Sequence, residues 1–527
     1  MTRQYKSANG GGIAPAVAAA AAIGLIAAIL ASCASSPDPA PSPKPSLSSS
    51  NAEQDEAAKR AALERIYGQK PEWVSCQDQA PPMVCARIEV PLNWDDPAGD
   101  QITITLARIP ATNPEARQGS LIVNPGGPGV SGIGYLQWMP MMASEAVQEV
   151  YDLVSFDPRG VGQSTPIDCL DDAGLDQYMA ISFNDDEEGL AKAIENAKAF
   201  GKACSEQTGP LLEFVDTASA AHDMDAIRAV LGDNKLNYLG YSYGTFLGAN
   251  YAEAFPELVG RMVLDGAIDP TRTARESEFD QMVAFDRSLT EFAAWCAKTR
   301  SCPAGTSQER ILADTVNLLN ATLDKPLPAG GGRQLTQSLA FQGILSPLYS
   351  ERTWPELGQA LAEAFQGDGT QLVLKADELY HRDSSTGRWE DNMAEAIVAI
   401  NCADSPVNGD LKEMGQDAAA LREAAPTLGQ FAGYGAITCS NWPFPARIKP
   451  HAIKAAGAAP ILVVGTTGDP ATPYEEAVAL ADQLESGVLL TLEGEQHTAY
   501  GSSNQCITAA VDGLLISGTV PKSGLRC

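Results

Sequence analysis

Short apolar runs rich in β-branched residues recur along the chain, and Gly, Pro, Asn or Asp bounds each of them. Runs of this kind are typical of β-strands. Two of them, 83–90 and 102–109, suit an antiparallel pair at the edge of a sheet. Six others are almost continuously apolar, as expected of strands that are covered on both faces. They are residues 120–124, 153–156, 236–240, 262–264, 461–464 and 488–492.

Helical periodicity fills the intervals between these runs, for example at 218–231, 245–254 and 474–484. The alternation predicts an α/β fold with mostly parallel central strands.

The interval from 274 to 450 breaks this alternation, because it has no strong strand run and contains helical stretches such as 276–298 and 308–323. We interpret it as a largely helical cap. An insertion after the strand that ends at Leu264 would cover the carboxyl edge of the sheet, where the active sites of such folds lie.

Residues 1–33 have the pattern of a targeting segment, with Arg3 and Lys6 before an Ala-rich apolar stretch at 13–31. The segment ends in Leu-Ala-Ser-Cys, which resembles a bacterial lipobox, so Cys33 is the expected site of lipidation. A plain signal anchor and a cleaved secretory signal are the alternatives. Two or three acyl chains suffice for stable anchoring. We therefore expect a lipid anchor on the extracytoplasmic face of the cell membrane.

The composition after Cys33 predicts a flexible tether at 34–65, because residues 35–50 are almost wholly Ser, Pro and Ala. The charged residues 51–65 suit the beginning of the first helix. The predicted parts that follow are the first part of the α/β core at 66–273, the cap at 274–450 and the second part of the core at 451–527.

Composition and net charge exclude some classes of protein and partner. The 527 residues are 44% apolar and 19% charged, which is ordinary for a globular protein. The formal net charge is −30, which argues against a nucleic-acid partner, because binding phosphates depends on clustered Lys and Arg.

The segment Gly240-Tyr241-Ser242-Tyr243-Gly244 follows an apolar run and precedes a helical pattern. This is the context of a nucleophile elbow, in which a strained turn lifts a serine hydroxyl above the sheet. A lone G-x-S-x-G is common by chance, but here the strand, the glycines and the helix coincide. We therefore predict that Ser242 is a catalytic nucleophile.

A serine needs a base, and the chain contains only four histidines. In α/β-hydrolases the histidine follows both the serine and the acid, which selects His497 just after the last strand. His222 precedes the serine, and His381 and His451 fall in the cap or at its end, so we expect packing or solvated roles for these three.

The acid that orients the histidine is expected on the loop after the strand 461–464, where Asp469 lies in Gly-Asp-Pro. Asp265 directly follows an earlier strand and is the rival; otherwise it would cap a turn. The favoured triad is Ser242, Asp469 and His497.

Two backbone amides should stabilise the oxyanion, one of them from the residue after the nucleophile, Tyr243. The second is expected from the N-P-G-G-P-G loop at 124–129, at Gly127 or alternatively Gly126. Asp157 and Arg159, in the D-P-R-G-V-G-Q-S segment, are predicted to brace this loop. No P-loop and no zinc-type His/Cys cluster is present in the sequence, so we expect no cofactor and no metal.

These motifs, in this order, resemble those of actinobacterial tripeptidyl aminopeptidases and their mycobacterial lipoprotein relatives, members of the prolyl-aminopeptidase superfamily. The likeness covers most of residues 70–527. It implies an α/β-hydrolase fold and a serine peptidase that removes short peptides, typically tripeptides, from free N-termini, sometimes with carboxylesterase activity. Prolyl iminopeptidases carry H-G-G-P-G, whereas Asn124-Pro125 precedes the glycines here, which favours the tripeptidyl branch.

An exopeptidase must bind a protonated amine, so carboxylates of the cap are expected near the end of the cleft, with Asp404 as a candidate. Thr472, three residues after Asp469, is a second candidate for a substrate contact, or else a turn hydroxyl. The rival enzyme class is a carboxylesterase or lipase that acts on envelope or other esters. A non-catalytic binding lipoprotein is a third reading, which loss of a triad residue would mark, and none is lost.

Ten cysteines remain after Cys33, an even number that predicts five disulfides in an exported protein. They fall into sequential couples, and pairing within these couples is our expectation. The couples are Cys76–Cys85, Cys169–Cys204, Cys296–Cys302, Cys402–Cys439 and Cys506–Cys527.

Overall fold

The computed structural model describes residues 49–76, 83–502 and 504–527, and the chain divides into two units after residue 58. Helix α1 (Ser49–Tyr67) includes the charged residues that were expected to begin the first helix. The predicted signal segment with Cys33 and residues 34–48 of the predicted tether lie outside the described residues. Among the described helices, none combines the length and the apolar character needed to cross a bilayer.

The second unit is built on a large, mostly parallel sheet. In the described part of the chain the sheet has ten strands, in the order β1-β2-β3-β5-β4-β6-β7-β12-β13-β14. The strands β1, β2 and β3 pair antiparallel, and β3 pairs antiparallel with β5, whereas the pairs from β5 to β14 are parallel. This confirms the α/β-hydrolase class and the antiparallel pair expected near the sheet edge.

The strands agree with the apolar runs of the sequence to within a few residues. Their bounds are β1 Val74–Ser75, β2 Val84–Pro91, β3 Gln101–Ile109, β4 Gly119–Asn124, β5 Tyr151–Phe156, β6 Leu236–Tyr241, β7 Val259–Asp265, β12 Ile461–Thr466, β13 Gly487–Leu492 and β14 Leu525–Arg526.

Successive side chains of the central strands enter two different apolar clusters. In β12, for example, Ile461 and Val463 pack into one cluster, and Leu462 and Val464 pack into the other. Because neighbouring residues of a strand point to opposite faces, both faces must be apolar when both are covered. This is why the central strands are continuous apolar runs rather than alternating ones.

Helices cover the two faces of the sheet. One face packs against α2 (Gly132–Leu136), α4 (Glu145–Val150) and α18 (Gln505–Ser517). The other face packs against α7 (Thr217–Leu231), α8 (Tyr243–Ala254) and α17 (Tyr474–Gln483). A further short helix, α3, spans Met139–Met142.

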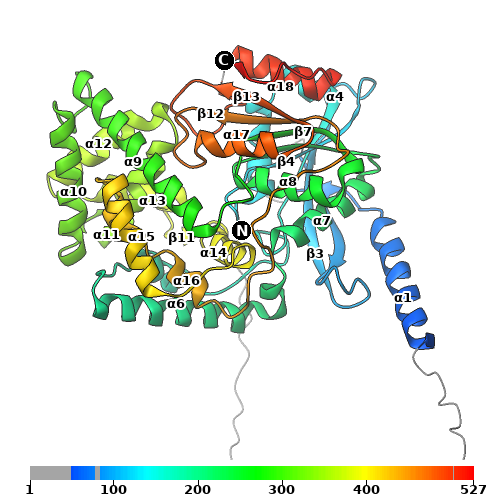
Figure 1. The fold of residues 1–527 in the computed structure, drawn as a ribbon, viewed down its shortest axis with the longest axis horizontal. Coiled ribbons are helices and arrows are strands. Elements are labelled where there is room, and N and C mark those ends of the chain that lie inside the picture. The colour runs from blue at the N-terminus through cyan, green and yellow to red at the C-terminus, as the bar shows by residue number, and fades with distance from the viewer. Residues whose placement is uncertain (1–48, 77–82, 503) are drawn as a thin grey trace, which may run out of the picture. The chain divides into compact units, whose positions relative to one another are not determined.

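Most of the residues between β7 and β12 form helices, which lie together to the left of the sheet in Figure 1. They are α9 Ala274–Lys298, α10 Gln308–Asp324, α11 Gln337–Leu345, α12 Trp354–Phe365, α13 Thr370–Leu379, α14 Met393–Asp404, α15 Leu411–Ala424 and α16 Ala436–Ser440. Two short strand pairs interrupt them, β8 (Leu327–Pro328) with β9 (Gln334–Leu335) and β10 (Arg382–Asp383) with β11 (Arg388–Trp389).

These helices have an apolar core of their own, which includes Phe285, Leu289 and Phe292 of α9 together with Trp354 and Leu361 of α12. Two more helices, α5 (Asp172–Ala180) and α6 (Glu187–Thr208), come from the interval between β5 and α7 and pack on α11 and α16. The helical region beside the sheet is therefore assembled from two separate stretches of the chain.

Five disulfides join the cysteines in the sequential couples that the sequence predicted. They are Cys76–Cys85, Cys169–Cys204, Cys296–Cys302, Cys402–Cys439 and Cys506–Cys527. The last one ties the C-terminal segment, whose Cys527 N–H donates to the Thr491 carbonyl of β13, to helix α18.

Candidate active site

Ser242 occupies a sharp turn between β6 and α8, with φ 54° and ψ −126°. Serine rarely adopts a positive φ, and such strain collects at functional sites. The flanking glycines are required by space: a Cβ on Gly240 would lie 2.4 Å from the Gly244 carbonyl oxygen, and one on Gly244 would lie 2.8 Å from that of Asn124. The Ser242 N–H donates to the carbonyl of Asp265 at 2.9 Å, which ties the turn to the next strand.

The imidazole of His497 faces a buried carboxylate. Its Nδ1 lies 2.9 Å from both Oδ1 and Oδ2 of Asp469, whose side chain is fully buried. The backbone N–H groups of Ala471 and Thr472 each donate to Asp469 Oδ1 at 2.9 Å. The acid is thus fixed by its own loop and can hold the imidazole in one tautomer and one orientation.

His497 and Ser242 line the same cavity. Nε2 of His497 is buried and makes no hydrogen bond to any described residue. Burial by itself would lower the pKa of His497, but the charge and the hydrogen bond of Asp469, with a smaller contribution from Asp265, outweigh it and raise the pKa above the ordinary value. In the absence of substrate the bond between base and nucleophile is often long in such sites.

Asp265, the rival acid, is also fully buried, but it binds the backbone rather than the imidazole. Its carboxylate accepts from the N–H of Ala499 at 2.9 Å and from the N–H of Tyr500 at 2.7 Å. Burial raises the pKa of Asp265 to about 7. The geometry therefore assigns Asp469 to the imidazole and Asp265 to the chain that follows the histidine.

The glycine loop lies directly against the nucleophile turn, since a Cβ on Gly126 would be 3.0 Å from the Tyr243 nitrogen. The Gly126 N–H is already engaged, because it donates to Asn124 Oδ1 at 3.0 Å. Gly127 lines the cavity, and its N–H has no acceptor among the described residues. Tyr243 begins α8, so its N–H has no acceptor within the helix. Gly127 and Tyr243 are the two amides that this arrangement leaves for an oxyanion.

Asp157 braces the segment after the glycine loop, as expected. Its carboxylate accepts from the Ser131 hydroxyl at 2.7 Å and from the Ile133 N–H at 3.1 Å. The expectation for Arg159 is wrong. Its guanidinium forms a buried, bidentate ion pair with Asp223 of α7, with bonds of 2.7 and 2.6 Å. Arg159 therefore ties the loop after β5 to α7, and not to the glycine loop.

The two candidates for substrate contacts both line the cavity, and both have partners within the protein. Thr472 donates its hydroxyl to Asp469 Oδ2 at 3.1 Å, so it supports the acid. Asp404 accepts two hydrogen bonds from Thr217, and burial raises the pKa of its carboxyl to about 8. The Asp404 carboxylate can still accept a further hydrogen bond, because a carboxylate has about four lone-pair positions.

The cavity beside Ser242 has a volume of about 650 Å³, within the range of small-molecule sites. Helices α9 and α14 supply part of its wall, including Glu278, Gln281, Ile397 and Asn401. Besides Asp404, the carboxylates of Glu278, Asp269 and Glu476 line it, and so do the guanidinium groups of Arg272 and Arg275. The cavity wall therefore holds ionisable side chains of both signs.

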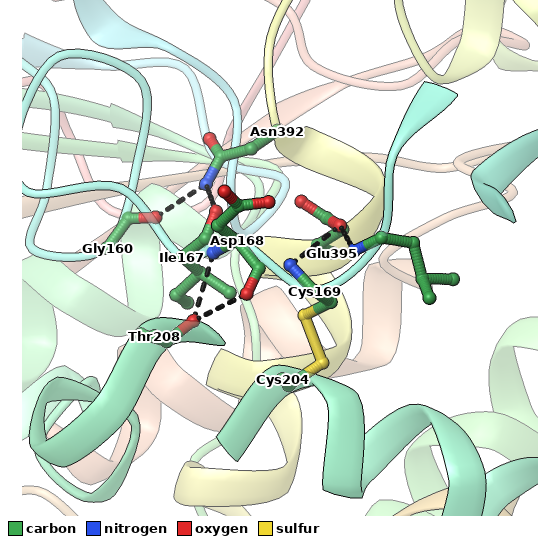
Figure 2. The surroundings of a disulfide bond; sticks show 9 residues. Gly160, Ile167, Asp168, Cys169, Cys204, Thr208, Asn392 and Glu395 are labelled. Carbon is green, nitrogen blue, oxygen red and sulfur yellow. Dashed lines mark hydrogen bonds between the residues drawn. A yellow bond between two sulfur atoms is a disulfide. The ribbon is translucent and has the colours of Figure 1, made fainter. Parts of the chain in front are cut away.

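Helix α14 is fixed to the core where it begins (Figure 2). Asn392 donates to the carbonyls of Gly160 and Ile167 at 2.8 and 2.9 Å. Glu395 accepts from the N–H of Cys169 at 3.0 Å, next to the Cys169–Cys204 disulfide. The cavity wall formed by α14 is thus attached to the loop after Asp157.

One further contact, between the cap and the histidine loop, has no signal in the sequence. The His497 N–H donates to the carbonyl of Tyr349 at 2.7 Å, and the Tyr349 ring packs edge-on against the imidazole at 5.5 Å. Ser350 and Gln496 form an antiparallel bridge beside it. Tyr349 ends a short 3-10 helix (Ser346–Tyr349), about 150 residues before the histidine, so no local motif connects the two.

The other three histidines have partners elsewhere, as expected. His222 stacks on Trp94 with ring centroids 5.4 Å apart. His381 Nδ1 lies 2.8 Å from Asp391 Oδ2, and His451 Nε2 lies 2.8 Å from Glu253 Oε2.

Comparisons with known proteins agree with this geometry. A family model described as TAP-like protein matches residues 425–527, which contain Asp469 and His497. The serine protease Hip1 of Mycobacterium tuberculosis is 40% identical over 483 residues, which cover 87% of this chain and 91% of the relative. Carboxylesterase B of the same species is 36% identical, covering 84% of this chain and 86% of its own. The tripeptidyl aminopeptidase of Streptomyces lividans is 30% identical, covering 89% and 88%.

Proposed function

Because the chain belongs to the family of α/β-hydrolases that includes the serine protease Hip1 and the tripeptidyl aminopeptidases, we propose that it is a serine peptidase that releases short peptides, mainly tripeptides, from free N-termini. The observation that carries the proposal is the pairing of His497 with the buried Asp469, in the cavity that also exposes the strained Ser242.

The proposed reaction passes through an acyl-enzyme. Ser242 Oγ attacks the carbonyl carbon of the scissile peptide while His497 Nε2 takes the hydroxyl proton. The N–H groups of Gly127 and Tyr243 donate to the oxyanion. The C–N bond then breaks, and the leaving amine receives the proton from Nε2. Water hydrolyses the ester in the same way and releases the peptide acid and the free serine.

The proposed substrate brings an α-ammonium group into the cavity. Asp404 and the other cavity carboxylates, Glu278, Asp269 and Glu476, are the groups that could receive it. Thr472 would then face the substrate from the acid loop.

Three substrates test the proposal: a tripeptide anilide with a free amine, the same anilide N-acetylated, and a short acyl ester. We expect a preference of at least about tenfold in kcat/KM for the free amine, which is worth about 1.4 kcal/mol. Equal rates on both anilides would overturn the aminopeptidase assignment. Ser242→Ala should abolish all three activities and also covalent labelling by a fluorophosphonate, with no change in the circular dichroism spectrum.

A carboxylesterase is the second candidate, supported by the similarity to carboxylesterase B. The same nucleophile and oxyanion amides would cleave an ester, whose leaving group needs less protonation than an amine. Fast ester turnover together with negligible turnover of both anilides would favour this function.

We also propose that the protein is exported and anchored to the extracytoplasmic face of the membrane through a lipidated Cys33. The support is the Leu-Ala-Ser-Cys segment after an Ala-rich apolar stretch. Cys33→Ala should move the protein from the detergent phase to the aqueous phase. Mass spectrometry of the mature N-terminus checks this, and an unmodified N-terminus at another residue would overturn it.

A further inference from the structure

Helix α14 meets the core a second time at its last residue, Asp404. This carboxylate binds Thr217, the first residue of α7: the Thr217 N–H donates to Oδ1 at 2.7 Å and the hydroxyl donates to Oδ2 at 2.6 Å. Such a contact satisfies one of the free N–H groups at the start of α7. It joins the cap to a core helix that packs against α8.

The Thr217 hydroxyl also contacts the phenol hydroxyl of Tyr243. A threonine hydroxyl has a single proton, and when Asp404 is ionised that proton goes to its Oδ2 at 2.6 Å, so the Thr217 oxygen then accepts from Tyr243. Burial raises the pKa of the Tyr243 phenol well above its ordinary value, so the phenol keeps the proton that it donates. The hydrogen bonds therefore run in one direction, from Tyr243 to Thr217 to Asp404.

This chain is well shielded from water. The exposed fractions of Asp404, Thr217 and Tyr243 are 6%, 0% and 7%. Buried hydrogen bonds of this kind are costly to break, because a group left without its partner pays its full desolvation penalty. The side chain of Tyr243 is thus held at its hydroxyl. The backbone N–H of the same residue is the one that directly follows the nucleophile.

We propose that Asp404 is a positioning residue that acts through Thr217 on Tyr243, so that the cap sets the direction of one of the two oxyanion amides. The inference rests on the proposed function only in that Tyr243 supplies this amide. A positioning role of Asp404 can be distinguished by experiment from a role in binding the substrate amine. A residue that binds the substrate amine matters for free-amine peptides alone, whereas a residue that orients an oxyanion donor matters for every acyl substrate.

The test measures kcat and KM on the short acyl ester, which has no amine. Thr217→Val removes the hydroxyl and keeps the side-chain size, Tyr243→Phe removes the other hydroxyl, and Asp404→Asn replaces one accepting carboxyl oxygen with an NH2 group. Each should lower kcat on the ester about tenfold with little change in KM, since misdirecting a donor costs less than deleting it. Thr217→Ser should restore the rate.

The double variant Thr217→Val with Tyr243→Phe should be no slower than the worse of the two single variants, because both break the same connection. The matched control is Thr315→Val in α10, another fully buried threonine, whose hydroxyl donates to the Ile311 carbonyl of its own helix at 2.8 Å. We expect this control to keep the wild-type kcat.

Thermal unfolding verifies that each variant is folded. If Thr217→Val does not fold, the ester rates of Tyr243→Phe and Asp404→Asn test the proposal. The proposal is overturned if the folded variants hydrolyse the ester within twofold of Thr315→Val, or if their losses appear only with free-amine peptides. An enzyme that turns over the ester but no peptide would contradict the proposed peptidase, and the ester rates would still test the role of Asp404.

Discussion

The neighbouring parallel strands β7 and β12 each deliver a buried aspartate to the surroundings of His497, and the two carboxylates do different work. Asp265 is the last residue of β7, and its oxygens are used by the N–H groups of Ala499 and Tyr500. Asp469 comes three residues after the end of β12, and its oxygens lie 2.9 Å from the imidazole.

The difference lies in how far the chain continues past the sheet. Asp265, on the last strand residue, meets the backbone that follows the histidine. Asp469, on the turn beyond its strand, meets the ring nitrogen Nδ1. Burial and negative charge near a histidine therefore do not identify the catalytic acid. The catalytic acid is identified by its contact with the ring nitrogen Nδ1.

The strongest test of this distinction is Asp469→Asn. The amide would favour the wrong imidazole tautomer, and we expect kcat to fall by about 10⁴-fold with the fold intact. Steady-state kinetics on the preferred substrate measures this. A loss of less than tenfold would mean that Asp469 does not orient the base.

Asp265→Asn should cost far less, about tenfold in kcat, because it weakens the support of the backbone after His497 without touching Nδ1. It also removes a negative charge that raises the pKa of His497. The base must be neutral to act, so activity rises with pH through that pKa, and the loss of the charge should move this acid limb to lower pH. A pH profile of kcat/KM checks the sign, and a shift to higher pH would contradict it.

Thr472→Val should have a smaller effect, because it removes a single hydrogen bond to Asp469 Oδ2 and leaves the N–H donors of the acid loop in place. We expect a loss of about three- to tenfold in kcat, and Thr472→Ser should recover it. If serine fails to rescue, the methyl group rather than the hydroxyl matters.

Breaking the Cys506–Cys527 disulfide should have the smallest effect on catalysis. The bond lies in the chain after Ala499 and Tyr500, the two residues whose N–H groups Asp265 binds, and it closes a loop with a sequence separation of 21 residues. The double variant Cys506→Ser with Cys527→Ser should lose about 3 kcal/mol of unfolding free energy, with kcat within about twofold of the wild type. Denaturant unfolding measures the first quantity, and a large loss of kcat would show that this tail positions the histidine.

The sequence predicted the sheet well, because strands covered on both faces must be continuously apolar and this pattern is local. It also predicted the Ser242 turn and the cysteine couples, whose signals lie within a few residues or follow chain order. The roles of Thr217 and Tyr349 could not be predicted. Thr217 is 187 residues from Asp404 in the chain, and Tyr349 lies in a different element from His497, so no local motif connects either pair. Arg159 was misassigned because spacing along the chain does not tell where a long side chain turns.

The contacts between cap and core have a consequence for recombination among relatives. The sequence predicts residues 274–450 as an insert, yet Tyr349 binds the histidine loop, Glu395 binds the loop at Cys169, and Asp404 binds Thr217. A chimera whose foreign cap lacks carboxylates at the positions of Glu395 and Asp404 would lose two of these pairings. A crossover that transfers the cap together with the histidine loop, the loop at Cys169 and the start of α7 would preserve these contacts. The segment that must be exchanged as one piece is therefore larger than the insert.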